Sequence, residues 1–135
     1  MIAETLYNVA KDLFGIFSKL DEARVQRKIR ISDYFSNLAQ TIEDTSAMLK
    51  KGIYPHGECA ELRYHAEKMV DSIGDAIGRD EAQKYQDKVL TVWRIEGMFD
   101  ELQDVIDSKK VEKLKTLDEA AGYFRGIAAH LRASP

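Results

Sequence analysis

Hydrophobic residues recur at three- and four-residue steps along most of the chain, which is the spacing of one face of an α-helix. The first stripe of this kind predicts an amphipathic N-terminal helical segment over residues 1–20: Leu6, Val9, Leu13, Ile16, Phe17 and Leu20. A second stripe follows a heptad rhythm: Ile31, Phe35, Leu38, Ile42, Thr45 and Leu49. A heptad rhythm is typical of helices that pack nearly antiparallel in a bundle.

Glycine and proline divide the first half of the chain. Gly52 ends a predicted helix over 21–51, and Pro55 precedes a predicted helix over 56–78. Glycine commonly follows the last residue of a helix, and proline is tolerated in its first turn. No glycine or proline separates 21–51 from the N-terminal segment. One continuous helix and two separate helices therefore both remain open for this region.

The second half of the chain has two further predicted helices. Gly78 is followed after a very short turn by a stripe that predicts a helix over 80–107. Helices joined by so short a turn must be antiparallel neighbours. Thr116 and Glu119 have the spacing of a capping box, which predicts that the last helix covers 116–133.

The composition is that of a globular helical protein. Hydrophobic residues make up 44% and charged residues 32%, with only two prolines, which excludes a disordered chain. The single cysteine cannot form an internal disulfide, and no apolar run approaches the ~20 residues that span a bilayer. The sequence predicts one cytoplasmic all-α domain over 1–135: an antiparallel four-helix up-down bundle with an additional N-terminal helical segment.

Charge is distributed unevenly along the chain. The net charge is −3, but residues 58–108 carry −7 and residues 109–135 carry +3. Opposite charges of this kind either pair helices within the bundle or offer patches to a partner. Arg24 and Arg27 belong to a short basic cluster, but no aromatic residues alternate with it, so nucleic-acid binding is not expected.

The turn after the second predicted helix carries the residues best suited to metal binding or nucleophilic catalysis. His56, Cys59 and His65 lie within ten residues, but their spacing matches no zinc-binding pattern. On a helical wheel Cys59 faces the apolar stripe and His65 its flank, so the two side chains diverge. We therefore interpret Cys59 as a core residue and His65 as paired with a nearby carboxylate. No catalytic residue, metal or cofactor is predicted, and the turn does not require His56, whose role stays open.

Three aromatic residues lie off the apolar stripes, and these are the best candidates for protein contact. They are Tyr7, Phe14 and Trp93; Asp104 and Asp107 belong to an acidic helix face that adds a second candidate surface. Exposed aromatic side chains are enriched at protein interfaces. The leading hypothesis is a non-enzymatic protein-protein interaction or adaptor module that binds itself, as a homo-oligomer, or another helical domain. The alternatives are a membrane-acting effector that uses the amphipathic N-terminal helix and, less favoured, a metal-dependent enzyme.

Two stretches carry a resemblance to known families. Residues 52–67, together with the segment Ile-Gly-Asp-Ala-Ile-Gly at 73–78, resemble a group of short bacterial helical proteins, mostly cyanobacterial. That resemblance implies a small helical bundle and no particular activity. The segment Gln-Asp-Val-Ile-Asp at 103–107 is similar to the acidic "EDVID" motif of plant immune-receptor coiled-coil domains. Those domains are four-helix bundles with an amphipathic first helix.

Overall fold

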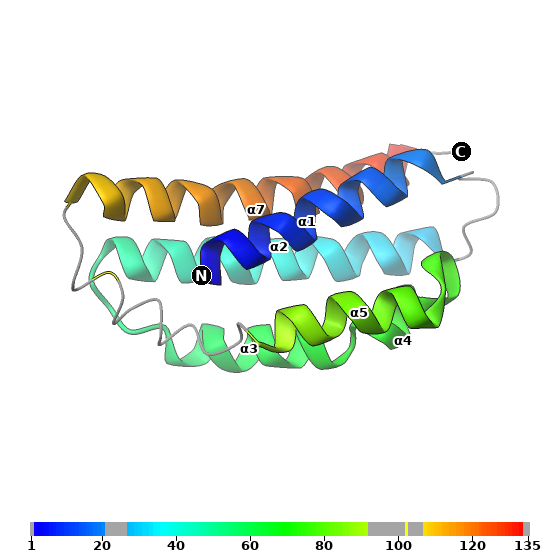
Figure 1. Ribbon diagram of the computed structural model, residues 1–135, viewed down its shortest axis with the longest axis horizontal. Helices are drawn as coiled ribbons and strands as arrows, with labels where there is room; N and C mark the ends of the chain where they lie inside the picture. Colours follow the sequence, from blue (N-terminus) through cyan, green and yellow to red (C-terminus); the bar gives the residue numbers. More distant parts are fainter. Residues whose placement is uncertain (1, 21–26, 92–101, 103–106, 134–135) are drawn as a thin grey trace.

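The described part of the chain consists of helices and short connections between them. The computed structural model describes residues 2–20, 27–91, 102 and 107–133, and no strand occurs among them. The helices are α1 (Ile2–Lys19), α2 (Lys28–Lys50), α3 (His56–Glu67), α4 (Met69–Ile77), α5 (Arg79–Leu90) and α7 (Asp107–Ala133). Figure 1 shows α1, α2 and α7 side by side along the molecule, with α3, α4 and α5 on the side away from α7. The all-α class is confirmed for these residues, and none of these helices is long and apolar enough to cross a membrane.

Helices α1 and α2 are separate helices. Arg27 has a φ of 59°, in the left-handed region, so a right-handed helix cannot pass through it and α2 begins at Lys28. The predicted apolar stripe of α1 forms its buried face: Leu6, Val9, Leu13 and Phe17. The other two members of the predicted stripe, Ile16 and Leu20, are only partly buried. The first helix is therefore part of the core of the molecule.

One column of phenylalanine rings joins the three long helices. Phe35 of α2 lies between Phe17 of α1 and Phe124 of α7, with ring centroids 5.4 Å and 5.7 Å away. The first pair meets edge to face and the second is stacked, and all three side chains are fully buried. Offset and edge-to-face aromatic pairs add about 0.5–1.5 kcal/mol each beyond their buried area. The column therefore contributes to the packing of α1, α2 and α7 on one another.

Cross-helix polar contacts follow the boundary between α2 and α7. Three ion pairs join them: Asp33 with Arg132, Glu43 with Arg125, and Lys50 with Asp118. Residue numbers on α7 fall as those on α2 rise, so the two helices run in opposite directions. Inside the boundary, the buried Ser32 hydroxyl donates a 2.9 Å hydrogen bond to the carbonyl oxygen of Ala128. The basic C-terminal segment thus pairs with α2, and not with the acidic residues of α3, α4 and α5 in the described structure.

Helix α2 ends as its sequence predicts. Gly52 has a φ of 71°, which glycine adopts at little cost. Its N–H donates to the carbonyl oxygen of Leu49 at 3.0 Å, and the N–H of Ile53 donates to that of Met48 at 2.9 Å. This is the hydrogen-bond pattern of a Schellman motif. Pro55 then occupies the residue before α3, so the chain reverses within a few residues.

The segment predicted as one helix over 56–78 forms two helices. The break lies at Lys68, between α3 and α4. In an uninterrupted helix the N–H of Val70 would donate to the carbonyl oxygen of Ala66. Instead it donates to the side-chain oxygen of Gln86 on α5, at 2.9 Å. A side chain from another helix therefore satisfies the backbone at the break, and the hydrophobic pattern of 56–78 could not show this.

The last helix begins earlier than predicted. Helix α7 begins at Asp107, so Thr116 lies inside it and the capping-box interpretation is wrong. The Thr116 hydroxyl donates to the carbonyl oxygen of Glu112 one turn earlier, at 3.1 Å. Threonine commonly makes this bond within a helix, which is why the same spacing that marks a helix start can also occur in its interior.

Candidate functional site

Three aromatic side chains form a ridge along the boundary of α1 and α7. Tyr7 and Phe14 of α1 lie on either side of Tyr123 of α7, with ring centroids 5.7 Å and 5.5 Å from it. We call these three residues the aromatic ridge. All three are partly exposed. The sequence identified Tyr7 and Phe14 but not Tyr123, because only the docking of α1 on α7 brings it between them.

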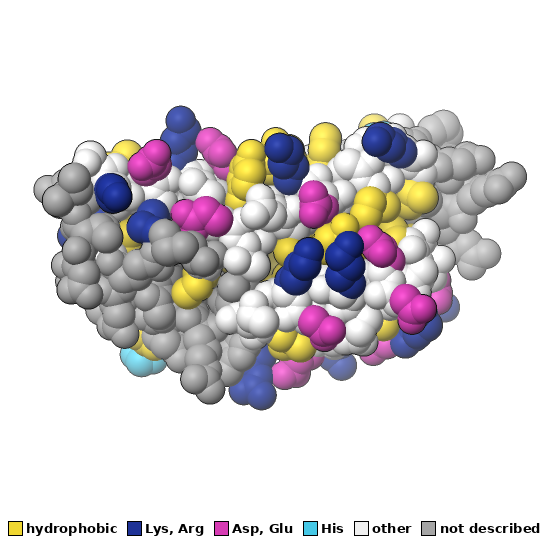
Figure 2. All heavy atoms as spheres, viewed as in Figure 1, with side chains coloured by type: hydrophobic (Ala, Val, Ile, Leu, Met, Phe, Trp, Pro, Cys, Tyr) yellow, Lys and Arg dark blue, Asp and Glu magenta, His cyan; other side chains and the backbone are white. Residues whose placement is uncertain are grey.

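A glycine allows Phe14 to lie against α7. A Cβ atom added to Gly126 would come within 2.9 Å of Cε2 of the Phe14 ring, closer than real Cβ contacts allow. Phe14 with Glu119, Gly122 and Tyr123 lines an open hollow of about 380 Å³ beside the ridge. The ridge is therefore a shallow, mainly apolar surface feature and not a deep pocket. In Figure 2 hydrophobic side chains reach the surface along the upper edge of the view, where α1 and α7 lie, between separate charged groups.

Charged residues of opposite sign lie beside the ridge. Lys11 of α1 places its ammonium group 5.9 Å from the ring centroid of Tyr7. The pKa of Tyr7 is raised, chiefly by its interaction with the side chain of Tyr123 and in addition by the negative charge of Glu119 on α7. Lys11 and Glu119 are both exposed. The ridge thus has a positive group on one helix and a negative group on the other.

The other predicted contact residues are not part of this surface. Arg27 is exposed at the start of α2, where its left-handed conformation sets the beginning of the helix. Asp107 is the first residue of α7, and its side chain lies outside the described residues. The remaining candidates also lie outside them: Arg24, Trp93 and Asp104.

The histidine and cysteine residues near the turn are not brought together as a metal site. The exposed His56 ring packs on Tyr54, with the centroids 4.1 Å apart and the ring planes tilted by 45°. Cys59 is buried in the core. Within the described residues, no three His, Cys, Asp or Glu side chains are grouped so that they could hold a metal ion.

His65 lies apart, against α2. Its ring is 6.2 Å from that of Tyr34, whose hydroxyl donates a 2.6 Å hydrogen bond to the carbonyl oxygen of His65. Burial raises the pKa of Tyr34, so the phenol remains a donor. Burial lowers the pKa of His65, and the negative charge of Glu61 partly opposes this effect. The imidazole is therefore mainly neutral near pH 7.

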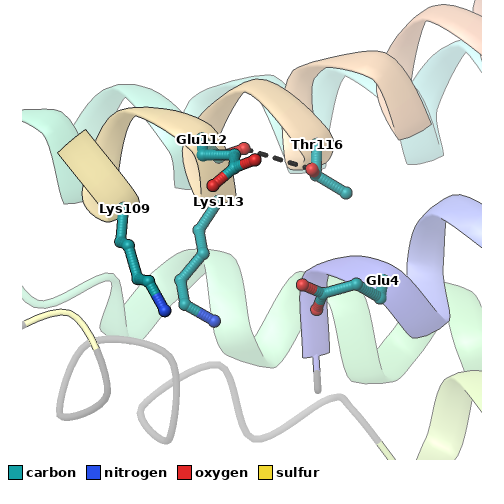
Figure 3. A pocket seen from close by; sticks show the side chains of 5 residues that line it. All are labelled: Glu4, Lys109, Glu112, Lys113 and Thr116. Carbon is teal, nitrogen blue, oxygen red and sulfur yellow. Dashed lines mark hydrogen bonds between the residues drawn. The ribbon is translucent and has the colours of Figure 1, made fainter. Parts of the chain in front are cut away.

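A small polar pocket lies between the start of α1 and the first turns of α7. Its volume is about 280 Å³ and its lining is Glu4, Lys109, Glu112, Lys113 and Thr116. Figure 3 shows the two lysine side chains extending from α7 and the Glu4 carboxylate pointing toward them from α1. Oε2 of Glu4 is buried and accepts no hydrogen bond from the described residues. Two carboxylates face two ammonium groups, so the described lining favours neither anions nor cations.

A larger groove lies between α2 and the α3/α4 pair. Its volume is about 430 Å³. The lining is Arg30, Asp33, Tyr34 and Asn37 from α2, with Tyr64, His65, Lys68, Asp71 and Ser72 from the other side. We call this the polar groove. The four residues from α2 occupy positions i, i+3, i+4 and i+7, so they share one face of that helix.

Comparison with known proteins assigns no family to this chain: no family model, curated protein or solved structure matches it. The resemblances to cyanobacterial helical proteins and to plant immune-receptor domains therefore stay predictions.

Proposed function

We propose that the protein is a non-enzymatic helical interaction module that self-associates through the aromatic ridge. The observation that carries this proposal is the set of three partly exposed rings, Tyr7, Phe14 and Tyr123, next to an open apolar hollow. Tyrosine and phenylalanine are enriched at protein interfaces because they offer a large contact area at a low cost in conformational entropy.

A second copy of the chain is the partner that the charges favour. In a two-fold symmetric dimer, residue i of one copy meets residue j of the other, and the reverse contact forms as well. Two equivalent ion pairs can then form, each between Lys11 of one copy and Glu119 of the other, beside the two aromatic ridges packed against each other. Stable interfaces bury about 800 Å² per partner. Three rings and their surroundings are a small surface, so we expect an association in roughly the micromolar range.

The packing of α1 disfavours the membrane-effector alternative. To insert into a bilayer, α1 would have to withdraw Leu6, Leu13 and Phe17 from the core, where all three are fully buried. Each such side chain contributes about 2 kcal/mol of hydrophobic free energy. The whole stability of a domain is only about 5–15 kcal/mol, so releasing the helix would remove much of it.

Sedimentation velocity over a wide range of protein concentration tests the proposal. The mass should rise from that of a monomer toward that of a dimer. Tyr7→Ser should shift this transition to concentrations at least about tenfold higher, because it removes one ring from the ridge. The matched control is Tyr64→Ser, the same change at an exposed tyrosine on α3. A monomer at every concentration, or equal effects of the two substitutions, would refute self-association through the ridge.

A charge exchange tests the two-fold arrangement. Lys11→Glu alone should weaken the dimer, because two like charges then meet at each end of the interface. Adding Glu119→Lys to the same chain should restore it, since the pairs form again with reversed signs. If the double variant did not recover dimer formation, this two-fold symmetry would be wrong.

A vesicle experiment tests the membrane-effector alternative. Leakage from vesicles that stops on removal of residues 1–18 would favour that alternative.

We also propose that the finer architecture is an antiparallel four-helix bundle formed by α2, the α3/α4 pair, α5 and α7, with α1 as an additional helix. Two observations support this arrangement. The ion pairs between α2 and α7 require opposite directions, and the single residue Gly78, with a φ of 96°, joins α4 to α5. In Figure 1 α1 runs in the same direction as α7.

A further inference from the structure

The polar groove lies where α4 packs on α5 and only lightly on α2. Helix α3 packs closely on α2, whereas α4 packs on α5 and touches α2 only lightly. The break at Lys68 therefore opens a space along α2 that side chains line but do not fill. Its volume of about 430 Å³ falls within the ~300–1,000 Å³ of small-molecule sites. A smaller adjoining hollow, which shares Arg30, Asp71 and Ser72, extends it toward the start of α2.

Both carboxylates of the groove are engaged by arginines from outside it. Asp33 pairs with Arg132 of α7, and Asp71 lies 3.5 Å from the guanidinium of Arg79. Neither arginine lines the groove. Each acidic side chain of the groove thus has a cation beside it that is not part of the groove lining.

The two cations of the groove have no such partner. Within the described structure, no acidic side chain forms an ion pair with Arg30 or Lys68. Counting the two outer arginines, four cations surround two carboxylates. The groove is therefore locally positive in a chain whose net charge is −3. A locally positive cleft attracts anions.

Aromatic rings and neutral polar groups complete the lining. Tyr64 is 59% exposed, and the ammonium group of Lys68 lies 5.7 Å from its ring centroid. The His65 ring meets Tyr64 edge to face at 5.9 Å. The side chains of Asn37 and Ser72 make no hydrogen bond with the described residues, so they can bond a ligand. Tyr64 therefore offers an exposed flat ring next to Lys68.

We propose that the polar groove binds a small molecule in which a phosphate group is attached to a planar ring. Arg30 and Lys68 hold the phosphate, because a guanidinium and an ammonium group both form charge-assisted hydrogen bonds with phosphate oxygens. The planar ring stacks on Tyr64, and Asn37 and Ser72 bond its polar substituents. This site lies on α2, α3 and α4, so it is independent of the aromatic ridge and of self-association.

An NMR titration of the full chain with phenyl phosphate tests this proposal. The ring signals of Tyr64 and His65 should shift in a saturable way. Inorganic phosphate and phenol, each carrying one half of the ligand, should bind at least about tenfold more weakly. Arg30→Gln and Lys68→Gln should each weaken phenyl phosphate binding about tenfold, since each removes a charged hydrogen-bond donor.

A lysine outside the groove provides the matched control. Lys84 lies over a tyrosine ring on α5, with its ammonium group 5.3 Å from the centroid of Tyr85, much as Lys68 lies over Tyr64. Lys84→Gln should leave phenyl phosphate binding unchanged. Circular dichroism of every variant checks that the helices are intact.

Four outcomes would overturn the proposal. The first is the absence of saturable shifts at Tyr64 and His65. The second is equally tight binding of inorganic phosphate, which would leave no role for the ring. The third is an equal loss of binding in the Lys84→Gln control, which would show general attraction of anions. The fourth is tighter binding of a phosphotyrosine peptide than of phenyl phosphate, which would make the natural ligand a protein side chain and not a small molecule.

Discussion

The contact between Phe14 and Gly126 can be tested by a pair of glycine substitutions in one helix. Gly122 and Gly126 both lie in α7, one turn apart. At Gly122 a Cβ atom would have no described atom within 4 Å, whereas at Gly126 it would lie 2.9 Å from Cε2 and 3.3 Å from Cδ2 of Phe14. The same change from glycine to alanine therefore probes open space at one position and a packed ring at the other.

Two opposing effects set the expected change in the free energy of unfolding. Alanine in place of glycine within a helix stabilises the folded state by about 1 kcal/mol. Inserting a methyl group into a packed contact costs about 1–3 kcal/mol, and the cost should be near the lower limit because Phe14 is partly exposed and can move outward. We expect Gly122→Ala to raise the free energy of unfolding by about 0.5–1 kcal/mol. Gly126→Ala should leave it unchanged or lower it by up to about 2 kcal/mol.

Urea unfolding followed by circular dichroism measures both values. The difference between the two variants should be about 0.5–3 kcal/mol, with similar slopes of the free energy against urea. Replacing Phe14 with leucine should reduce that difference, since residues in direct contact are not additive. If Gly126→Ala stabilised the protein as much as Gly122→Ala, Phe14 would not lie against α7. Phe14 would then not form part of the aromatic ridge.

Three further predictions concern the polar contacts. The hydrogen bond and charge of Arg125 lower the pKa of Glu43 below its usual 4.5, so the stability from this pair should be complete above that pH and lost as the pH falls through the folded value. Urea unfolding should therefore show that the difference in free energy of unfolding between the parent and Glu43→Gln proteins shrinks from pH 7 to acid pH. A difference that stays constant with pH would contradict this. Burial lowers the pKa of His65 below 6.5, so its contribution to stability should likewise be present above pH 6.5 and fall with acidification; a ring titration by NMR with its midpoint at or above 6.5 would disprove this. Gln86→Leu should lower stability by about 1 kcal/mol and speed hydrogen exchange at the Val70 amide, whereas Gln83→Leu, which removes only an exposed contact on the same helix, should change neither.

The sequence alone determined the helical class and several helix ends. The buried stripe of α1 and the end of α2 at Gly52 follow from local chemistry, because periodicity and the conformational freedom of glycine act over a few residues. The interpretation of Cys59 as a core residue also agrees with its burial. The interpretation of Thr116 as the start of a helix was wrong because threonine can bond to the backbone within a helix as well as at its start.

Only the tertiary structure decided which surfaces face one another. The break at Lys68 depends on a hydrogen bond from Val70 to a side chain on α5. The aromatic ridge depends on Tyr123, which comes more than a hundred residues after its neighbour Tyr7. The polar groove depends on α4 packing mainly on α5 and only lightly on α2. The physical reason is common to all three: such contacts depend on the relative placement of whole helices, and the hydrophobic pattern of any one helix records only which face is buried.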